Sequence, residues 1–449
     1  MDPQSQTETI ELPTKETGPF PVKEPVLSEQ TRDNAPPEIK WLYLKLISSG
    51  FSFFVAGIND GSLGSLIPYV LRSYHIGTNL VVVIYGVTFL GWLIAAVTNS
   101  SICQYLGLGS ILALGAALQV IAHALRAWLP PFALYTATFF LVTLGQAYND
   151  THANTYVSSV NAAHRWLGFI HAMYMAGCLV GPFVSTAVAS ANVDSRWYLF
   201  YLFPLGLGLV NLVLILIAFR DRMKVEPSFG HARHHAGSVD SSGNGDVEPK
   251  GKRAIQEIKE TLSAPSVWLL SLFFFFFLGA AITSGGWVVE YLVKVRDGDL
   301  QDMGYVPTGL YGGAFLGRLV LAEPTYRLGE RRMVLIYALL CVGLQLVFWL
   351  VPNIIAAAIA ISLVGFFSGP FFATGISVGS KIFRAEIRSS AIAFVFVLGQ
   401  IGGALFPALT GVIAARAGVS VLQPIVVALL CATGISWAIL PKASGLHRE

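Results

Sequence analysis

The composition of this chain of 449 residues excludes a soluble globular protein, because 54% of its residues are hydrophobic and only 12% are charged. About a quarter of the residues of a soluble domain carry a charge. Apolar runs of about 20 residues recur along the sequence, and each is long enough to cross roughly 30 Å of hydrocarbon. Only helices and closed barrels satisfy every backbone polar group in lipid. The continuously apolar runs therefore predict an all-α polytopic membrane protein, and the formal charge of +3 indicates no partner by itself.

The hydropathy pattern predicts twelve transmembrane helices. The spans are expected near residues 42–69, 79–99, 109–128, 132–157, 166–190, 197–219, 265–292, 305–322, 333–351, 353–377, 390–415 and 420–440. They divide the chain into a disordered tail (1–40), an N-terminal six-helix bundle (41–220), a linker (221–264), a C-terminal six-helix bundle (265–440) and a short tail (441–449). The first tail is polar and rich in Pro and Glu, so we expect no cleavable signal and no contribution to a core.

The distribution of basic residues predicts the orientation. The tails and the even-numbered loops carry 22 of the 29 lysines and arginines. The odd-numbered loops carry only six, among which we count Arg126. The positive-inside rule therefore places both termini and the linker in the cytoplasm. Within the linker, the Gly/Ser/His-rich stretch 228–250 is expected to be flexible, and 251–263 to be an amphipathic helix on the membrane surface.

The two halves resemble each other at a shift of 222 residues. Six glycines and one tyrosine of the first half then coincide with the same residue type in the second: Gly57 with Gly279, Gly64 with Gly286, Tyr69 with Tyr291, Gly91 with Gly313, Gly107 with Gly329, Gly177 with Gly399 and Gly181 with Gly403. Composition alone predicts about two such glycine pairs. Parallel six-helix repeats around a midplane site are typical of one large class of transporters.

The first span carries an acid in its interior. In FSFFVAGINDGSLGSLIPY, Asn59 and Asp60 lie in the middle of an apolar run. An ionised carboxylate at bilayer depth costs several kcal/mol, roughly 3 on insertion scales, so it usually marks an ion or substrate pathway. By helical rise, Asp60 lies about 6 Å beyond the midpoint of its span. The alternative is that it only hydrogen-bonds a neighbouring helix.

The fourth span carries a second acid on a polar stripe. Gln146, Asp150 and Asn154 follow one another at i, i+4 and i+8, so they share one helix face. Two acids at different depths suit a site that opens alternately to either side, and either carboxyl can carry a proton when it is buried. The expected substrate-binding residues are Asn59, Gln146, Asn149, Asn154, Tyr174 and Trp287.

Small residues in the fifth span indicate close helix packing. Gly177 and Gly181 are spaced for close approach of two backbones, and Pro182 adds a bend. Packing or conformational roles are also expected for Arg318, Gly329 and Arg331. Arg318 lies near a cytoplasmic helix end, where snorkelling of its side chain into the interface explains it.

At these residues the chain resembles the major facilitator superfamily, from about residue 40 to its end. GINDGSLGSLIPY and NDTHAN look like the acidic helices of the fucose permease branch. GLYGGAFLGRLVLAEPTYRLGERRM, GFFSGPFF and LGQIGGALFPALTG look like a fungal branch of small-molecule transporters. The resemblance implies the twelve-helix major facilitator fold, alternating access, and proton coupling through Asp60 and Asp150.

Two motifs depart from the family pattern. The loop after the second span reads QYLGLG, with Gln104 where the family usually has an acid and with no basic residue following. The repeat copy, YRLGERR, keeps its arginines, so gating by the first loop is in question. The fifth span partly matches the antiporter motif of proton-driven drug exporters, but Ser185 and Thr186 replace its two final glycines.

The sequence therefore predicts a proton-coupled secondary transporter of a small organic solute. Export of a fungal metabolite is favoured by the fifth span, and uptake of a sugar-like solute by the two acids. A non-transporting solute sensor is a further alternative. No motif indicates an enzyme, a cofactor, a metal site or nucleic-acid binding, and the four cysteines are interpreted as small apolar residues. The expected partners are the solute, protons and the lipid bilayer. We expect a monomer in the plasma membrane.

Overall fold

A computed structural model describes residues 37–192, 194–224, 259–384 and 387–441. The chain forms two compact units, Met1–Tyr43 and Leu44–Glu449. In the first unit only the start of the first helix, residues 37–43, is described. That helix begins at Pro37, before the predicted boundary at residue 41. The rest of the predicted disordered tail, the flexible stretch 228–250 and residues 442–449 lie outside the described residues.

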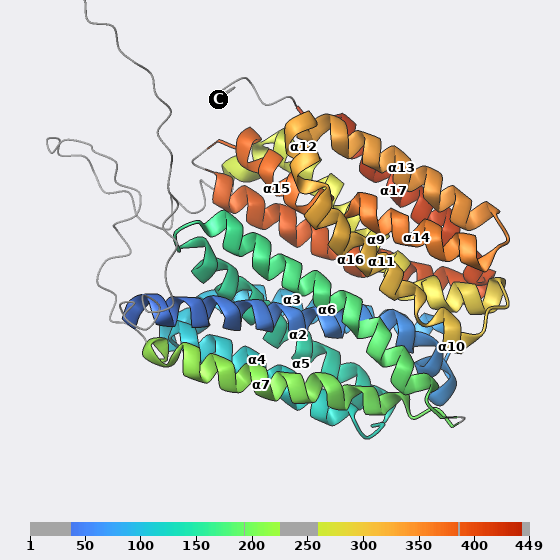
Figure 1. The fold of residues 1–449 in the computed structure, drawn as a ribbon, viewed down its shortest axis with the longest axis horizontal. Helices are drawn as coiled ribbons and strands as arrows, with labels where there is room; N and C mark the ends of the chain where they lie inside the picture. Colours follow the sequence, from blue (N-terminus) through green and yellow to red (C-terminus); the bar gives the residue numbers. More distant parts are fainter. Residues whose placement is uncertain (1–36, 193, 225–258, 385–386, 442–449) are drawn as a thin grey trace, which may run out of the picture. The chain divides into compact units, whose positions relative to one another are not determined.

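The N-terminal half (N half) contains the six predicted helices, which Figure 1 colours from blue to green. They are α2 (Pro37–Ser73), α3 (Thr78–Tyr105), α4 (Leu108–Arg126), α5 (Phe132–Ser158), α6 (Ala163–Ser190) and α7 (Leu202–Ala218), the last preceded by the 3-10 turn η1 (Trp197–Tyr201). A second 3-10 turn, η2 (Arg220–Arg222), follows α7. Of the predicted amphipathic helix 251–263, residues 259–263 are helical and the rest lies outside the described residues.

The C-terminal half (C half) repeats this order with two helices broken into shorter pieces, coloured from yellow to red in Figure 1. Its elements are α9 (Pro265–Val295), α10 (Leu300–Met303), α11 (Val306–Val320), α12 (Ala322–Leu328), α13 (Glu330–Leu350), α14 (Ile354–Ser368), α15 (Phe371–Ile382), α16 (Arg388–Ala417), η3 (Val419–Val421) and α17 (Leu422–Ala438). The predicted span 353–377 is thus interrupted at Gly369 and Pro370, between α14 and α15. The described residues contain helices and no strand.

Ten helices of the described chain are long and apolar enough to cross a membrane. The predicted spans in α5 and α11 do not meet these criteria of length and hydropathy, for different reasons. Polar residues crowd the second part of α5, including Gln146, Asn149 and Asp150. The helix α11 has only 15 residues, because the chain turns into α12 directly after Leu321. Both occupy the place in the fold that the sequence predicts for a transmembrane helix.

The internal repeat is visible in how equivalent helices pack. Gly91 of α3 lies against Thr143 of α5, so closely that a Cβ on the glycine would overlap the threonine hydroxyl. Its repeat partner Gly313 of α11 lies equally close to α14, where a Cβ would overlap the backbone carbonyl oxygen of Ser362. The repeat relates α3 to α11 and α6 to α16. The contacts between the halves follow the same relation, because α3 packs against α16 and α6 packs against α11. The prediction of an all-α polytopic membrane protein with two pseudo-symmetric halves is confirmed, and the twelve predicted spans are consistent with the helices of the described residues.

Several helix ends follow from local sequence. Asn353 caps α14, because its side-chain oxygen accepts a hydrogen bond of 2.9 Å from the backbone N–H of Ala356. Pro265 opens α9 at a position where its missing N–H costs nothing. Gly329 separates α12 from α13 with φ of 101°, a backbone conformation that disfavours any side chain. The repeated loop glycine predicted from the sequence is therefore required by the backbone in the C half.

Candidate functional site

Asp60 lies on α2 and is held by donors from three helices. Its Oδ2 accepts hydrogen bonds from Gln146 Nε2 of α5 at 2.7 Å and from the hydroxyl of Tyr174 of α6 at 2.8 Å. Its Oδ1 accepts a bond of 3.0 Å from Nδ2 of Asn59, the preceding residue. A carboxylate that receives several hydrogen bonds is stabilised in its charged form. The structure therefore brings together Asn59, Asp60, Gln146 and Tyr174, which were predicted from separate segments.

A buried arginine completes this cluster. Arg126 Nη1 donates to Oδ1 of Asn59 at 3.0 Å, and its Nε donates to Thr138 Oγ1 at 2.6 Å. The sequence analysis counted Arg126 among the residues of an outer loop, and this was wrong. The residue ends α4, and only 1% of its surface is exposed.

Aromatic rings form the rest of the Arg126 environment. The guanidinium lies 3.7 Å from the ring centre of Phe139 and 5.2 Å from that of Tyr201. His123, one turn earlier on α4, is fully buried and stacks on Tyr201 with 6.3 Å between ring centres. Cation–π contact partly replaces the hydration that Arg126 loses. The placement of His123 and Arg126 three residues apart, on one face of α4, was an available signal for this cluster, and sequence reasoning missed it.

Asp150 has no such support. It lies one turn after Gln146 on α5, within range of electrostatic repulsion from Asp60. Its Oδ1 is buried and has no hydrogen-bond partner among the described residues. The two acids of the site thus differ: Asp60 is held by three donors, whereas Asp150 faces a second acid.

The other predicted substrate-binding residues lie elsewhere. Asn149 is buried between helices, where Nδ2 donates to Ser52 Oγ at 3.2 Å. Asn154 is half-buried, two turns beyond Gln146. Trp287 is fully buried in the C half, and its indole N–H donates to the carbonyl of Pro407 at 3.0 Å. In this conformation Asn149 hydrogen-bonds Ser52, although it directly precedes Asp150, and Trp287 hydrogen-bonds Pro407. Neither side chain has a hydrogen bond to an acid of the site among the described residues.

The glycines of α6 bring it against α2. A Cβ on Gly177 would overlap the carbonyl oxygen of Phe54, and one on Gly181 would come within 2.5 Å of the carbonyl oxygen of Ile58. Pro182 lies inside the helix, directly after this contact. Small residues allow this approach of two backbones. Since α2 carries Asp60 and α6 carries Tyr174, the close packing fixes their hydrogen bond.

Two residues of the C half reach toward this site, and sequence reasoning missed one of them. Tyr311 of α11 lies close enough to Asp60 to interact with it electrostatically. Arg318, also of α11, donates to the carbonyl of His171 in the N half at 3.5 Å, and its guanidinium lies 5.7 Å from the ring centre of Phe372. Snorkelling therefore does not explain Arg318, because its side chain points between the halves.

The halves are joined at the end of the bundle where α2 ends and α3 begins. Ser65 Oγ donates to the carbonyl of Gly304 at 2.9 Å, and Thr78 Oγ1 donates to that of Gly411 at 3.1 Å. A Cβ on Gly64 would overlap the carbonyl oxygen of Gly285. Thr186, one of the two residues that replace the motif glycines, packs against Gly304 at the same end.

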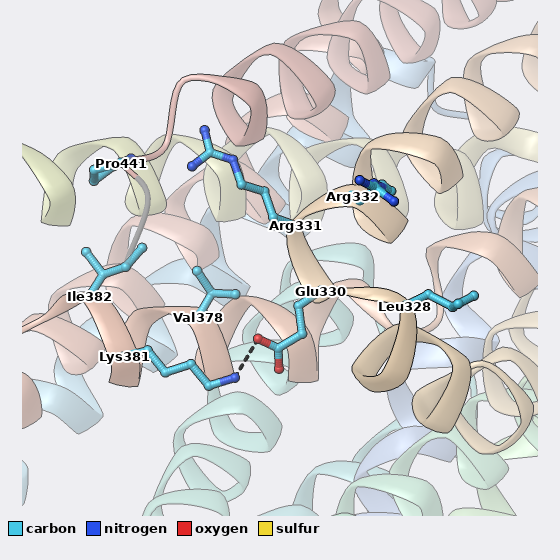
Figure 2. A pocket seen from close by; sticks show the side chains of 9 residues that line it. Leu328, Glu330, Arg331, Arg332, Val378, Lys381, Ile382 and Pro441 are labelled. Atoms are coloured by element: carbon cyan, nitrogen blue, oxygen red, sulfur yellow. Dashed lines mark hydrogen bonds and ion pairs between the residues drawn. The ribbon is translucent and has the colours of Figure 1, made fainter. Parts of the chain in front are cut away.

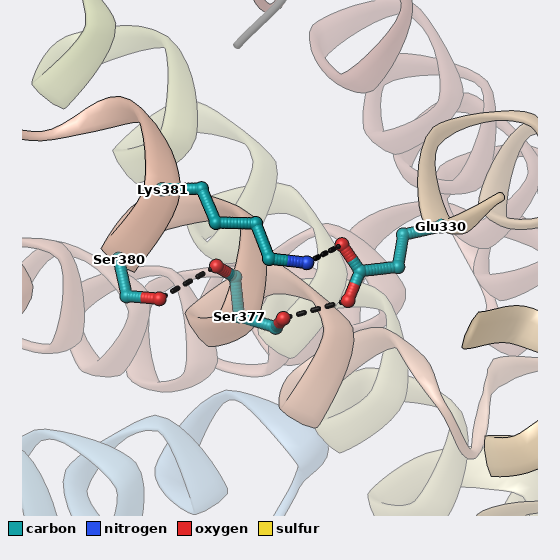
Figure 3. Close-up of polar contacts among 4 residues, drawn as sticks. All are labelled: Glu330, Ser377, Ser380 and Lys381. Carbon is teal, nitrogen blue, oxygen red and sulfur yellow. Dashed lines mark hydrogen bonds and ion pairs between the residues drawn. The ribbon is translucent and has the colours of Figure 1, made fainter. Parts of the chain in front are cut away.

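A second polar cluster lies at the opposite end of the C half, around the loop glycine. Glu330 accepts hydrogen bonds of 2.6 Å from Ser377 Oγ and from Lys381 Nζ, which ties the start of α13 to α15 (Figure 3). Arg331 donates to the carbonyl of Ala438 at 2.8 Å. Gly329, Glu330, Arg331 and Lys381 are among the residues that line an open pocket of about 420 Å³ (Figure 2). Glu330 and Lys381 form an ion pair, so this cluster holds α13 and α15 together.

The comparisons with known proteins agree with this architecture. The family model of the Major Facilitator Superfamily matches residues 49–323. "Bypass of stop codon protein 6" of Saccharomyces cerevisiae is 27% identical over 427 residues, which cover 90% of this chain and 84% of that protein. A bacterial homologue of the human lysosomal transporter Spinster, inward-facing and unoccupied, superposes with a TM-score of 0.69 at 13% identity, over 89% of this chain and 96% of the homologue.

A second solved structure is the transporter FucP in its outward conformation. Its TM-score is 0.60 at 16% identity, over 89% of this chain and 98% of that one. At such identities these structures show the fold alone. The family match covers more than half of the chain, which therefore belongs to the major facilitator superfamily. It is a multi-pass membrane transporter that works by alternating access, and not an enzyme.

Proposed function

We propose that this member of the major facilitator superfamily couples the movement of a small organic solute to that of protons. The observation that carries the proposal is the pair of intramembrane acids in the N half. Asp60 gathers donors from α5 and α6, and Asp150 stands one turn from Gln146 without a hydrogen-bond partner at its Oδ1. Acids inside a membrane bundle are costly, and they typically form proton relays.

The solute is proposed to bind between the halves, against the polar stripe of α5. Gln146, Asp150 and Asn154 supply donors and acceptors from the N half. Tyr311 and Arg318 approach the same level from α11 of the C half. A site built from both halves responds to their relative movement, which is the requirement for alternating access.

Export is the direction that we favour, because the fifth span matches part of an exporter motif and packs at Gly177 and Gly181 against the helix that carries Asp60. Uptake of a sugar-like solute is the alternative, and the two acids support it. We further propose a monomer in the plasma membrane with both termini in the cytoplasm. We propose no role in nucleic-acid binding.

The test is proton movement in sealed liposomes that contain the purified protein. A pH-sensitive dye inside the vesicles reports protons while a panel of sugars and small amphiphilic organic compounds is added outside. We expect at least one compound to change the internal pH. Asp60→Asn and Asp150→Asn should abolish that change while both variants remain folded.

The direction follows from the same vesicles. With an imposed pH gradient, movement of the compound against the flow of protons supports export. Accumulation on the side that protons enter overturns export and favours uptake. Binding of a compound without any flux would contradict transport and favour the solute sensor.

A further inference from the structure

Arg126 is a buried charge without a carboxylate in direct contact among the described residues. Its Nε and Nη1 donate to neutral groups, Thr138 and Asn59, and its Nη2 has no hydrogen-bond partner in the described part of the chain. A buried charge is costly unless an opposite charge compensates it. An arginine at a helix C-terminus gains from the helix dipole, typically 0.3–1 kcal/mol, which is small against a desolvation cost of several kcal/mol. A further source of compensation is therefore required.

Asn59 connects Arg126 to that source. Its carbonyl oxygen accepts from the guanidinium, and its amide nitrogen donates to Asp60 Oδ1. One amide thus bridges a buried cation and a buried carboxyl group, and each of its polar ends faces the charge that it stabilises. Among the described carboxylates, Asp60 is the one that interacts electrostatically with Arg126.

We infer that Arg126 is the fixed counter-charge that keeps Asp60 ionised, so that Asp150 is the acid that takes up and releases the transported proton. The inference rests on the proposed function and assigns its two acids different roles. Arg126 and Asp60 cancel each other through the Asn59 bridge. A protonated Asp150 leaves the cluster neutral, whereas an ionised Asp150 places a negative charge beside Asp60.

The surrounding groups do not disturb this charge balance, and the half-buried cation Arg318 of α11 interacts electrostatically with Tyr174 and Cys178 rather than with either acid. The titratable neighbours of the two acids are Tyr174 and Cys178 on α6 and Tyr311 on α11. All three are uncharged at neutral pH in water, and burial disfavours their charged forms. His123 faces Arg126, and an imidazolium would add a second buried cation there. We therefore treat His123 as neutral.

Infrared difference spectroscopy tests the assignment without a known solute. The full-length protein in lipid vesicles is measured between about pH 5.5 and pH 9, where exposed acids stay ionised. In this range the carbonyl stretch of a protonated carboxyl arises from buried acids. Subtracting the spectrum of a variant from that of the wild type removes the bands of acids that are unchanged in both, such as Glu290. We expect one band that is lost in Asp150→Asn and retained in Asp60→Asn.

Arg126→Gln should add a second titrating band, from Asp60. The conservative variant Arg126→Lys should keep the single band, because it keeps the charge. The matched control is Arg296→Gln, since Arg296 of the C half donates to the carbonyls of Phe348 and Trp349 and to no acid of the site. Where Arg126→Gln does not fold, Asn59→Ala interrupts the bridge and should add the same second band.

Two results overturn the inference in different ways. A band that vanishes in Asp60→Asn and persists in Asp150→Asn reverses the two roles and leaves proton coupling intact. The absence of any band that these substitutions remove refutes proton coupling through either acid, and with it the proposed function. An unchanged spectrum in both Arg126→Gln and Asn59→Ala refutes the counter-charge alone.

Discussion

The two halves share one scaffold but differ in what fills their cores. In the N half a network of polar groups runs from Arg126 through Asn59 to Asp60. In the C half the corresponding helix α9 is lined by aromatic rings, such as Phe273 against Trp437 with 4.7 Å between ring centres. At the repeat shift of 222 residues, Ile282 occupies the place of Asp60. The repeated architecture therefore does not require an acid, and its presence in one half indicates a function.

The C half also contains buried polar side chains, and one pair of them hydrogen-bonds across two of its helices. Gln345 of α13 donates to Gln423 of α17 at 2.6 Å, and both are at most 1% exposed. This pair joins two helices of the same half. In the C half, then, a buried polar pair holds two helices together. In the N half, several hydrogen-bond donors surround one acid.

Among substitutions that leave both acids in place, the largest effect is expected when Asp60 loses a donor. Gln146→Leu removes the hydrogen bond to Asp60 Oδ2. A hydrogen bond to a charged group contributes about 1.5–3 kcal/mol, which corresponds to roughly 10- to 100-fold in rate. We expect solute-dependent proton movement to fall by about this factor in the liposome assay.

The matched control removes both members of the polar pair in the C half. Replacing both partners of a buried hydrogen bond by apolar groups of similar shape is nearly neutral. The double variant Gln345→Leu/Gln423→Leu should therefore keep proton movement within about twofold of wild type. An equal loss in both variants would mean that the halves do not differ in the way we describe.

A smaller effect is expected where the halves meet. In Gly64→Val, the new side chain would overlap the carbonyl oxygen of Gly285, so the contact between α2 and α9 cannot close as it does in the structure. Overpacking costs about 1–3 kcal/mol, which shifts the population away from this closed state by at least about fivefold.

Disulfide crosslinking measures this shift. The rings of Phe183 and Tyr305 lie 5.6 Å apart across the halves, so cysteines placed there, in a chain without its own four cysteines, should crosslink less in Gly64→Val. Gly86→Val is the control, because a Cβ on Gly86 meets no atom within 4 Å. Unchanged crosslinking in Gly64→Val would show that this contact does not control closure.

The smallest effect concerns an ion pair at the end of the N half. Lys45 Nζ lies 2.5 Å from Asp221 Oδ2. Burial raises the pKa of the Asp221 carboxyl, but the hydrogen bond and charge of Lys45 outweigh burial and hold this pKa below its ordinary value. The pair therefore contributes stability above about pH 4, the unfolded value, and this contribution is lost as the pH falls through the lower folded value.

The Asp221 side chain is 55% exposed, so the pair contributes at most about 1 kcal/mol. We expect the thermal midpoint of Asp221→Asn to lie slightly below that of wild type at pH 7 and to approach it as the pH falls through the lowered folded pKa, below which the carboxyl is protonated in both states. A gap that widens on acidification would contradict this sign. Glu323→Gln, which removes an exposed pair with Arg327 in the C half, serves as the control.

Much of the fold was predictable because membrane insertion imposes a strong pattern. Each predicted span except 353–377 corresponds to a helix at nearly the same residues, and the repeated glycines Gly91 and Gly313 lie at equivalent helix contacts. The short helix α11 and the break before α15 were not predicted, since hydropathy does not register where a helix turns or stops inside an apolar run.

The site was predictable only in part. The types and spacing of Asp60, Gln146 and Asp150 indicated a polar face, but hydropathy gives no helix rotation. For that reason Trp287 was predicted to bind the solute, whereas in the structure its indole N–H donates to the carbonyl of Pro407. Arg126 was assigned to a loop because a basic residue at the end of an apolar run looks like a flanking charge. Only its contact with Asn59, far away in sequence, shows that it belongs to the site.

The central claim is that proton coupling belongs to the N half. Its most direct test compares Asp150→Asn with Glu290→Gln, the substitution of a buried acid in the C half, in sealed liposomes with any compound that moves protons through the wild type. We predict that Asp150→Asn abolishes solute-dependent proton movement while it still exchanges the compound across the membrane, and that Glu290→Gln retains proton movement within about fivefold. Proton movement at the wild-type rate in Asp150→Asn, or its loss in Glu290→Gln alone, would contradict the account.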